Sequence, residues 1–570
     1  MVRIGNVSGF YGDRLDAARE MVGTGDVDVV CGDYLAELTM LILAKAQVRD
    51  GGVGYARTFL TQVEQILATC VERGTRIVAN AGGLDPAGLA GAVREVAARL
   101  GVAARVAHVE GDDLRGDLSA VHPPVRGTPV SANAYLGAWG IAEALAAGAD
   151  VVVTGRVTDA SLVVGPAAWW HGWERADWDA LAGAVVAGHV IECGPQATGG
   201  NYPFLDEITD RRYPGFPIAE VAADGASVIT KPDGSGGLVS VGTVTAQLLY
   251  EIGPPAYAGP DVTAHFDTIR IARDGEHRVA LSGVRGSPPP PTLKVALNDD
   301  AGYRNTMTLV LTGLDVEAKA AYAQELLFGI VDRSAFDEVD VRLLRSDHPD
   351  AASNAEATAH LRITVKGADR RTVGRAFSNA TMQLALGGYA GFHTTTPPSD
   401  ASAFGVYRPA AVPRSAVTHT VVLPDGSRRT VADPPRTDAP PDPPATAVAG
   451  APAPLDAGPT RRVPLGTVVG ARSGDKGGDA NIGVWARDDA GHAWLSGFLT
   501  PARVRELLGA EAADLDVDVH PLPNLRAVNV VVHGLLGDGV ASSTRPDPQA
   551  KGLGEYLRSR VVEVPEALLG

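Results

Sequence analysis

Apolar, strand-like runs alternate with helical stretches across residues 1–160, and this alternation constrains the fold more than any other feature. Continuous apolar strands separated by helices predict a parallel sheet with helices on both faces. We therefore predict an α/β body with a Rossmann-like, doubly wound arrangement. The predicted strands are Arg3–Val7, Val27–Cys31, Arg76–Ala79, Arg105–Val109 and Asp150–Thr154, and the predicted helices are Arg14–Met21, Ala36–Val48, Tyr55–Arg73, Pro86–Leu100 and Asn133–Ala147.

Residues 185–425 give shorter signals separated by Gly and Pro turns, which predict a second α/β lobe of the same body. The body is thus predicted to span residues 1–425. Its second lobe has predicted strands at Ser227–Thr230, Leu238–Val244, Thr268–Ala272, Thr308–Thr312 and His360–Val365, and a predicted helix at Ala318–Phe328.

A proline- and alanine-rich segment at residues 433–460 contains nine prolines, no aromatic residue and no lysine. Such a segment buries little apolar area, so we predict a linker with polyproline character. Residues 462–570 follow it with strand and helix signals in the order β-α-β-β-α, which predicts a small ferredoxin-like α+β domain. Those signals are Pro464–Arg487, Arg503–Leu508, Val517–Leu522, Ala527–Gly534 and Leu553–Val561.

Bulk composition narrows the function classes. The formal net charge is −17, from 50 basic and 67 acidic residues, which argues against a nucleic-acid partner. Three cysteines argue against a disulfide framework, and no apolar run is long enough to span a bilayer. The first residues show no secretory leader, so we expect a cytoplasmic protein without a membrane partner. We expect a homo-oligomer that binds a small anionic substrate in a local cationic pocket.

Polar groups follow the carboxyl ends of the predicted parallel strands, where open α/β sheets bind their ligands. Because four such loops meet at one sheet edge, they predict a shared site; the alternative is that Asp and Asn simply cap helices. Arg156 offers a planar fork to a carboxylate or phosphate, or pairs structurally with Asp159. Asp33 and Asp159 are acid–base candidates if burial raises their pKa values. The other binding candidates at this edge are Ser8, Asn80, Gly82 and Gly83.

Three further segments carry candidate residues. The loop Glu192–Tyr202 supplies Glu192 as a proton-transfer candidate and Asn201 as a binding candidate. Cys193 within it is a nucleophile candidate or, as no histidine stands in a convincing relation to it, a bystander thiol. Lys231–Gly237 places Lys231 beside bare backbone, as an anion site or a hairpin turn does.

The segment Arg472–Asn481 offers two cations, Arg472 and Lys476, with exposed backbone N–H groups. It predicts an anion-binding nest or a wide β-hairpin. The spacing fits neither a phosphate-binding P-loop nor a calcium loop. We assign no metal, because the histidines lack ligand spacing, and no cofactor. The first strand's loop lacks G-x-G-x-x-G, which disfavours nicotinamide or flavin binding.

At these segments the chain resembles the acyclic terpene utilisation (AtuA) family. The resemblance is carried over residues 1–420 by Ile4–Arg14, Gly32–Glu37, Asn80–Gly83, Thr154–Asp159, Glu192–Tyr202 and Lys231–Gly237. The Arg472–Asn481 segment resembles the small ferredoxin-fold domain that accompanies the family. The resemblance implies bacterial catabolism of acyclic terpenoids, a route that handles branched acyl-CoA thioesters beside a biotin-dependent carboxylase.

We therefore expect an enzyme of acyl-CoA or small-carboxylate catabolism that works by hydration, dehydration or carbon–carbon cleavage. The first alternative is a non-catalytic subunit or scaffold of an acyl-CoA carboxylase-like complex. The second is a nucleotide-dependent ligase that uses its glycine-rich loops for phosphate.

Overall fold

The computed structural model describes residues 1–50, 52–439 and 458–569, so most of the predicted linker at 433–460 lies outside the described residues. The predicted division into a 1–425 body and a 462–570 domain stays a prediction. The chain forms two compact units. Unit 1 comprises Met1–Asn298, Tyr407–Val540 and Asp547–Gly570, and unit 2 comprises Asp299–Val406 and Ala541–Pro546.

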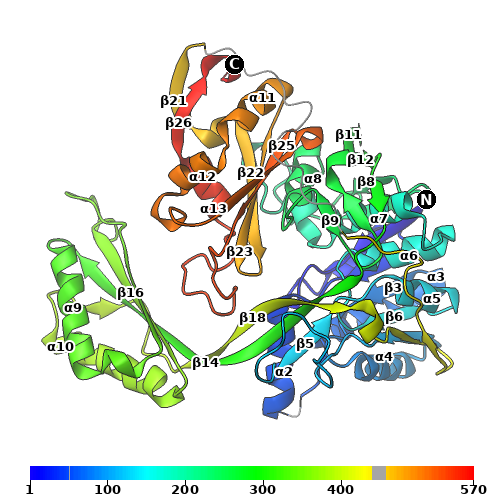
Figure 1. Cartoon of the computed structure of the whole chain (residues 1–570), viewed down its shortest axis with the longest axis horizontal. Helices are drawn as coiled ribbons and strands as arrows, with labels where there is room; N and C mark the ends of the chain where they lie inside the picture. The colour runs from blue at the N-terminus through cyan, green and yellow to red at the C-terminus, as the bar shows by residue number, and fades with distance from the viewer. Residues whose placement is uncertain (51, 440–457, 570) are drawn as a thin grey trace. The chain divides into compact units, whose positions relative to one another are not determined.

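Unit 1 is built on an 11-stranded sheet with a parallel centre (Figure 1). Its central strands are parallel in the order β1-β2-β3-β6-β4. Antiparallel strands extend both sides of this centre. The central strands are β1 (Val2–Asn6), β2 (Val29–Gly32), β3 (Arg76–Ala79), β6 (Val151–Thr154) and β4 (Val106–Glu110); the flanking strands are β7 (Ile218–Val221), β8 (Ser227–Thr230), β12 (Arg278–Ser282), β11 (Arg270–Gly275), β19 (Thr420–Val422) and β20 (Arg428–Thr430).

Alternate residues of the central strands enter two different cores. Val29, Val78 and Val152 pack in the core that contains α5, α6 and α7. Their neighbours Val30 and Ile77 pack in the core that contains α1, α3 and α4. Both sheet faces are therefore covered, as continuous apolar strands predict. The helices are α5 (Trp139–Ala146), α6 (Ser161–His171), α7 (Trp178–Ile191), α1 (Ala17–Thr24), α3 (Arg57–Arg73) and α4 (Pro86–Leu100).

The fold is mixed α/β, as predicted, and the predicted strands of residues 1–160 are confirmed to within a few residues. In a doubly wound sheet the chain returns to the other side of its first strand to add further parallel strands. Here the parallel strands β2, β3, β6 and β4 all lie on one side of β1. The Rossmann-like, doubly wound description therefore stays a prediction. Two assignments are wrong. The predicted helix Asn133–Ala147 begins only at Trp139, because Ser131–Ala134 forms strand β5 against β14 (Thr292–Thr312).

The predicted strand Leu238–Val244 instead runs into helix α8 (Val241–Leu248). A capping box starts this helix. The Thr243 backbone N–H donates to Ser240 Oγ, and the Ser240 N–H donates to Thr243 Oγ1. Short apolar runs are ambiguous between strand and helix, and here the cap decides for the helix.

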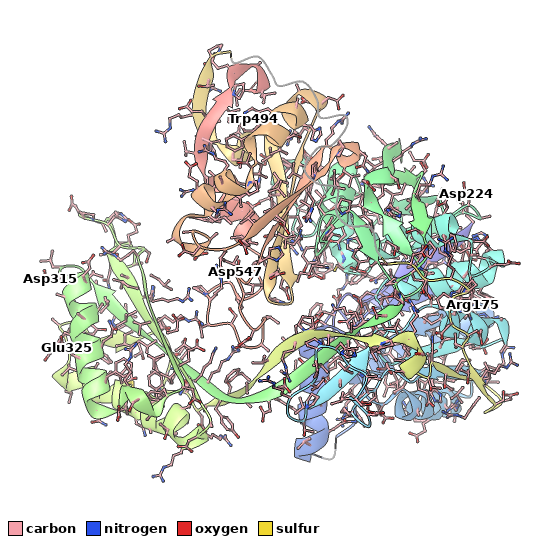
Figure 2. The ribbon with its side chains drawn as sticks, viewed as in Figure 1. Arg175, Asp224, Asp315, Glu325, Trp494 and Asp547 are labelled. Atoms are coloured by element: carbon pink, nitrogen blue, oxygen red, sulfur yellow. The ribbon has the colours of Figure 1, made fainter. Side chains whose placement is uncertain are left out.

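The C-terminal part of unit 1, residues 458–540 and 547–569, forms a four-stranded antiparallel sheet in the order β22-β23-β25-β24. The predicted β-α-β-β-α order did not include helix α11. In this helix Trp494, labelled in Figure 2, stacks on Phe498 with ring centres 4.5 Å apart. The elements are β21 (Thr460–Pro464), β22 (Val469–Lys476), β23 (Asp479–Ala486), α11 (Asp489–Phe498), α12 (Pro501–Leu508), β24 (Val517–Leu522), β25 (Ala527–Val532), α13 (Leu553–Ser559) and β26 (Val561–Pro565).

Unit 2 is an antiparallel sheet with two helices against one face. Met307 and Ile363 of that face pack with Phe377 in one apolar core. Arg304 and Arg362, on the strands of the same sheet, donate to backbone oxygens of Ala541 and Thr544 at 3.0 and 2.8 Å. Its elements are the distal half of β14, β15 (Glu338–Leu344), β16 (Thr358–Gly367), β17 (His393–Thr394), α9 (Val316–Ile330) and α10 (Phe377–Gly387).

Candidate functional site

The ends of β1, β2 and β3 bring three predicted site residues into contact. Asp33 follows β2, and its backbone N–H donates to the Ser8 carbonyl at 2.9 Å. Asn80 follows β3; its Nδ2 donates to Asp33 Oδ1 at 2.6 Å, and its Oδ1 accepts from the Tyr34 N–H at 2.7 Å. All of these side chains are buried. Asn80 therefore fixes the orientation of the Asp33 carboxyl group.

Arg156 follows β6 and is the buried cation of this edge. Its Nη1 donates to the Leu35 carbonyl at 2.8 Å, and its Nη2 lies 2.9 Å from Asp159 Oδ1. The guanidinium carbon lies 4.2 Å from the centre of the Tyr135 ring. The predicted pairing of Arg156 with Asp159 thus exists. The buried Nε has no hydrogen-bond acceptor among the described residues, so one donor of the fork is unused.

Glu192 joins the same region from the C-terminal end of α7. Its carboxylate Oε1 lies 3.2 Å from His189 Nδ1, one turn earlier on the helix. The His189 ring in turn lies 5.6 Å from the Tyr257 ring and 5.5 Å from the Phe266 ring. Neither ring nitrogen of His189 has a hydrogen-bond partner within the described part of the chain. Residues 194–198 of the predicted loop form a short 3-10 helix.

The segment Arg472–Asn481 forms the hairpin between β22 and β23, the second of its two predicted geometries. Its Lys476 Nζ donates to the Glu251 carbonyl at 2.8 Å, and its Asn481 Oδ1 accepts from the Glu251 N–H at 2.7 Å. Arg472 hydrogen-bonds Gln196 and lies with its guanidinium carbon 4.6 Å from the centre of the Tyr250 ring. The hairpin therefore contacts the segment that follows α8 and the turn that follows Glu192.

Lys551 adds a third cation from the C-terminal part. Its Nζ hydrogen-bonds Tyr250 Oη and lies 3.7 Å from Glu251 Oε1 and 3.8 Å from Asp475 Oδ1. Asp547, labelled in Figure 2, holds the backbone here, since its carboxylate accepts the N–H groups of Lys551 and Gly552 at 2.9 Å each. We call Asp33, Arg156, Asp159, Glu192, Glu251, Asp475, Lys476 and Lys551 the charged cluster.

A model of the acyclic terpene utilisation family protein AtuA matches residues 2–423, and a model of the AtuA ferredoxin-like domain matches residues 463–563. The chain belongs to the AtuA family. Its C-terminal part is a ferredoxin-like domain of the type found with that family. A search of curated proteins found no match.

Burial raises the pKa of four carboxyl groups in the charged cluster of this AtuA-family chain, those of Asp33, Asp159, Glu192 and Asp475. The pKa of Asp33 lies well above its usual value because of burial and the nearby Asp159 charge, against the opposing effect of Arg156. The pKa of Asp159 is raised by burial, and that of Glu192 is raised well above its usual value by burial and by Asp159. Groups of this kind hold a proton toward neutral pH.

Titratable groups in the cluster and next to it differ in pKa because their surroundings differ. Burial and the Glu251 charge raise the pKa of Asp475 to about 7, while burial lowers the pKa of His189 to about 4. For Glu37, burial is outweighed by Lys294 and Arg156, and its pKa falls to about 2. Lys294 Nζ lies 3.4 Å from Glu37 Oε1. Pairs of acids pushed to opposite protonation states are the arrangement that acid–base chemistry needs.

Some predicted site residues lie elsewhere or serve the backbone. Lys231 donates to the Ser235 carbonyl at 2.5 Å and lines a separate cleft of about 400 Å³. Asn201 is exposed, at a φ of 57°, and among the described residues no hydrogen bond ties it to the cluster. A side chain at Gly82 would stand 2.4 Å from the Thr154 carbonyl, and Gly83 has a φ of 52°. These two glycines allow close backbone approach beside Asn80.

Sequence reasoning missed several members of the site. Glu37 lies at the end of the Gly32–Glu37 segment, at the start of the helix Glu37–Asp50 that follows β2, and could have been found there. Glu251, Lys294 and Lys551 stand in no motif, and only the folded chain brings them to the cluster. Among the described residues, no group of three or more His, Cys, Asp or Glu side chains could hold a metal ion. Within residues 1–50, 52–439 and 458–569, no helix has the length and apolar content to cross a bilayer.

Proposed function

We propose that this chain is an enzyme of acyl-CoA or small-carboxylate catabolism, of the terpenoid or branched-chain type, with hydratase or lyase chemistry. Membership of a family named for acyclic terpene utilisation supports a catabolic role. The observation that carries the proposal is the convergence of two buried carboxyl groups, Asp33 and Glu192, and the half-buried Asp159 on one buried arginine, Arg156.

Hydration and dehydration need one group that accepts a proton from carbon and one that donates a proton to oxygen. In the dehydration direction, a carboxylate takes the proton beside the acyl carbonyl, and the electron pair of that C–H bond forms the double bond. A protonated carboxyl group gives its proton to the leaving hydroxyl, which departs as water. Asp33 and Glu192, whose pKa values are raised well above the usual range, suit the donor role. The pKa of Asp159 is also raised by burial, but its ion pair with Arg156 opposes the rise, so Asp159 suits the acceptor role.

A negatively charged substrate is supported by the cations that surround these acids. The unused Nε of Arg156 is a buried donor, and Lys476 approaches from the ferredoxin-like domain with one hydrogen bond to a carbonyl. A carbonyl or carboxylate oxygen that accepted the Arg156 Nε–H would satisfy a donor that otherwise stays unpaired.

The test is turnover of a panel of acyl-CoA esters and free branched carboxylates by the full chain. Asp33→Asn keeps the shape of the side chain and removes its proton chemistry, so we expect a loss of roughly 100-fold or more in kcat. Asp179→Asn is the matched control, since Asp179 pairs with Arg285 on the exposed surface and should leave turnover unchanged. Full activity in both Asp33→Asn and Arg156→Lys would exclude this site.

One observation favours a second candidate, the non-catalytic subunit of an acyl-CoA carboxylase-like complex. Arg156 already binds a carbonyl and a carboxylate of its own chain, as a structural cation does. Under this alternative the purified chain turns over no ester, and it co-purifies with biotin-containing carboxylase subunits. Turnover by the isolated chain would exclude it.

A further inference from the structure

Glu251 has an unusual backbone for its residue type. Its φ is 56°, in the left-handed region that non-glycine residues rarely occupy. It follows the end of α8 by three residues, and Tyr250 before it is buried. A non-glycine residue stays in this conformation only where its surroundings hold it there.

The ferredoxin-like domain supplies that hold. Asn481 accepts the Glu251 N–H at 2.7 Å, and Lys476 donates to the Glu251 carbonyl at 2.8 Å. Both backbone groups of this one residue are thus bound by side chains of a single hairpin. The next two residues, Ile252 and Gly253, are held in the same way, because Asn529 Nδ2 donates to their carbonyls at 3.1 and 2.8 Å.

The two asparagines also bind each other. Asn481 Nδ2 donates to Asn529 Oδ1, and both side chains are fully buried. Each amide therefore uses its oxygen and its nitrogen, and each reaches across to the segment of Glu251. A satisfied buried amide network of this kind fixes one geometry, whereas apolar packing would tolerate several.

The Glu251 carboxylate stands among the groups of the charged cluster. Lys551 Nζ lies 3.7 Å from its Oε1. Its charge raises the pKa of Glu192, Asp159 and Asp475. Among the described residues, the titratable groups that face this charge include His189 and Glu192 from α7 and its end, Asp159 from the loop after β6, Cys193, Tyr250 and Tyr257 from the body, and Asp475, Lys476 and Lys551 from the ferredoxin-like domain.

We propose that the ferredoxin-like domain completes the site by holding the Glu251 carboxylate within the charged cluster, with Asn481 as the positioning residue. The ferredoxin-like domain would then contribute to the site of the body and would not simply be linked to it. It deepens the proposed function, but the arrangement itself can be tested without a substrate.

The test measures the melting temperature of the full chain from pH 5 to pH 9 in Asn481→Ala, Glu251→Gln and a control. Burial, together with the Glu251 charge, keeps the pKa of Asp475 above its unfolded value. The stability that comes from such a group is full below the unfolded pKa and is lost as pH rises through about 7. Glu251→Gln removes the charge at constant shape and leaves the burial of Asp475 in place, so we expect the fall in melting temperature between pH 5 and pH 8 to become measurably smaller without disappearing. Asn481→Ala should reduce it in the same direction.

Asn524→Ala is the matched control. Asn524 also belongs to the ferredoxin-like domain and also donates to body carbonyls, those of Phe266 and Ile269 at 2.8 and 2.9 Å. Its loss should lower the melting temperature by a similar amount at every pH and leave the pH-dependent fall unchanged. The proposal is overturned if Asn481→Ala behaves like Asn524→Ala, or if Glu251→Gln keeps the wild-type fall. Since no substrate enters, a chain inert toward every acyl-CoA ester would refute the proposed function without deciding this test.

Discussion

The charged cluster has two sides, and their cations are held differently. On the body side, Arg156 leaves only 4% of its side chain exposed and is bound by a carbonyl, a carboxylate and an aromatic face. On the side of the ferredoxin-like domain, Lys551 is 38% exposed, and its two carboxylate neighbours stand at 3.7 and 3.8 Å, beyond hydrogen-bond distance. The body thus holds its cation by two polar contacts and a ring face, whereas Lys551 of the domain has a hydrogen bond to Tyr250 Oη and two carboxylate neighbours beyond hydrogen-bond distance.

Removing the body-side cation should have the largest effect. Arg156→Met leaves the buried Asp33 and the half-buried Asp159 without their shared cation, so we expect the free energy of unfolding to fall by about 3–5 kcal/mol. Urea unfolding at neutral pH measures the change. Arg99→Met is the control, because Arg99 pairs with Glu64 on the exposed surface and should cost less than about 1 kcal/mol. Equal costs in the two variants would contradict the difference between buried and exposed cations.

The second-largest loss of stability is expected from Gly474→Ala, at the contact between the ferredoxin-like domain and the body. A methyl group there would stand 2.4 Å from Cε2 of the Tyr250 ring, so Gly474→Ala should force the ring to move and cost about 1–3 kcal/mol. Gly497→Ala, within α11 and with nothing within 4 Å, should instead be neutral or stabilising. Urea denaturation curves of the two variants check the prediction. A Gly474→Ala protein as stable as the wild type would show that Tyr250 does not pack closely against Gly474.

The protonation of Asp475 should give a smaller effect that depends on pH. Its pKa of about 7 exceeds the unfolded value, so its contribution to stability is full below about pH 4 and is lost as pH rises through 7. Asp475→Asn should flatten the stability profile between pH 4 and pH 7. Asp489→Asn, on the exposed start of α11, should keep the wild-type slope. If Asp475→Asn keeps the wild-type dependence of stability on pH, the pKa of Asp475 is not raised by its surroundings.

Cys193 should give the smallest effect. Burial and the charges of Glu192 and Glu251 raise the pKa of its thiol well above the usual value, so at neutral pH the thiol stays protonated. Iodoacetamide should modify Cys193 more slowly than it modifies free glutathione, and Cys193→Ser should change the free energy of unfolding by less than about 1 kcal/mol. Fast alkylation at neutral pH would revive the nucleophile interpretation.

The sequence predicted the body side of the cluster better than the domain side. Apolar runs such as Arg76–Ala79 mark parallel strands, and the rule that ligands lie beyond strand ends then points to Asp33, Asn80 and Arg156. The position of Glu251 depends on the packing of α8 against the hairpin, which leaves no local pattern in the chain. The same limit explains Lys231, whose segment looks like an anion loop but lines a different cleft.

Fold errors arose where local signals compete. Leu238–Val244 reads as an apolar strand until the Ser240–Thr243 capping box is recognised. Strand β5 has the sequence Ser-Ala-Asn-Ala, which carries no strand propensity, and it forms because β14 offers it a partner. Tertiary pairing of this kind overrides local propensity.

Burial raises the pKa values of Asp33 and Glu192 beside Arg156, so we expect both carboxyl groups to hold protons at neutral pH. The infrared difference spectrum between the wild-type chain and Asp33→Asn at pH 7 tests it most directly. We expect the substitution to remove a protonated-carboxyl band and to leave the carboxylate bands nearly unchanged. Loss of a carboxylate band instead would show that Asp33 is ionised and would rule out a proton held at this site.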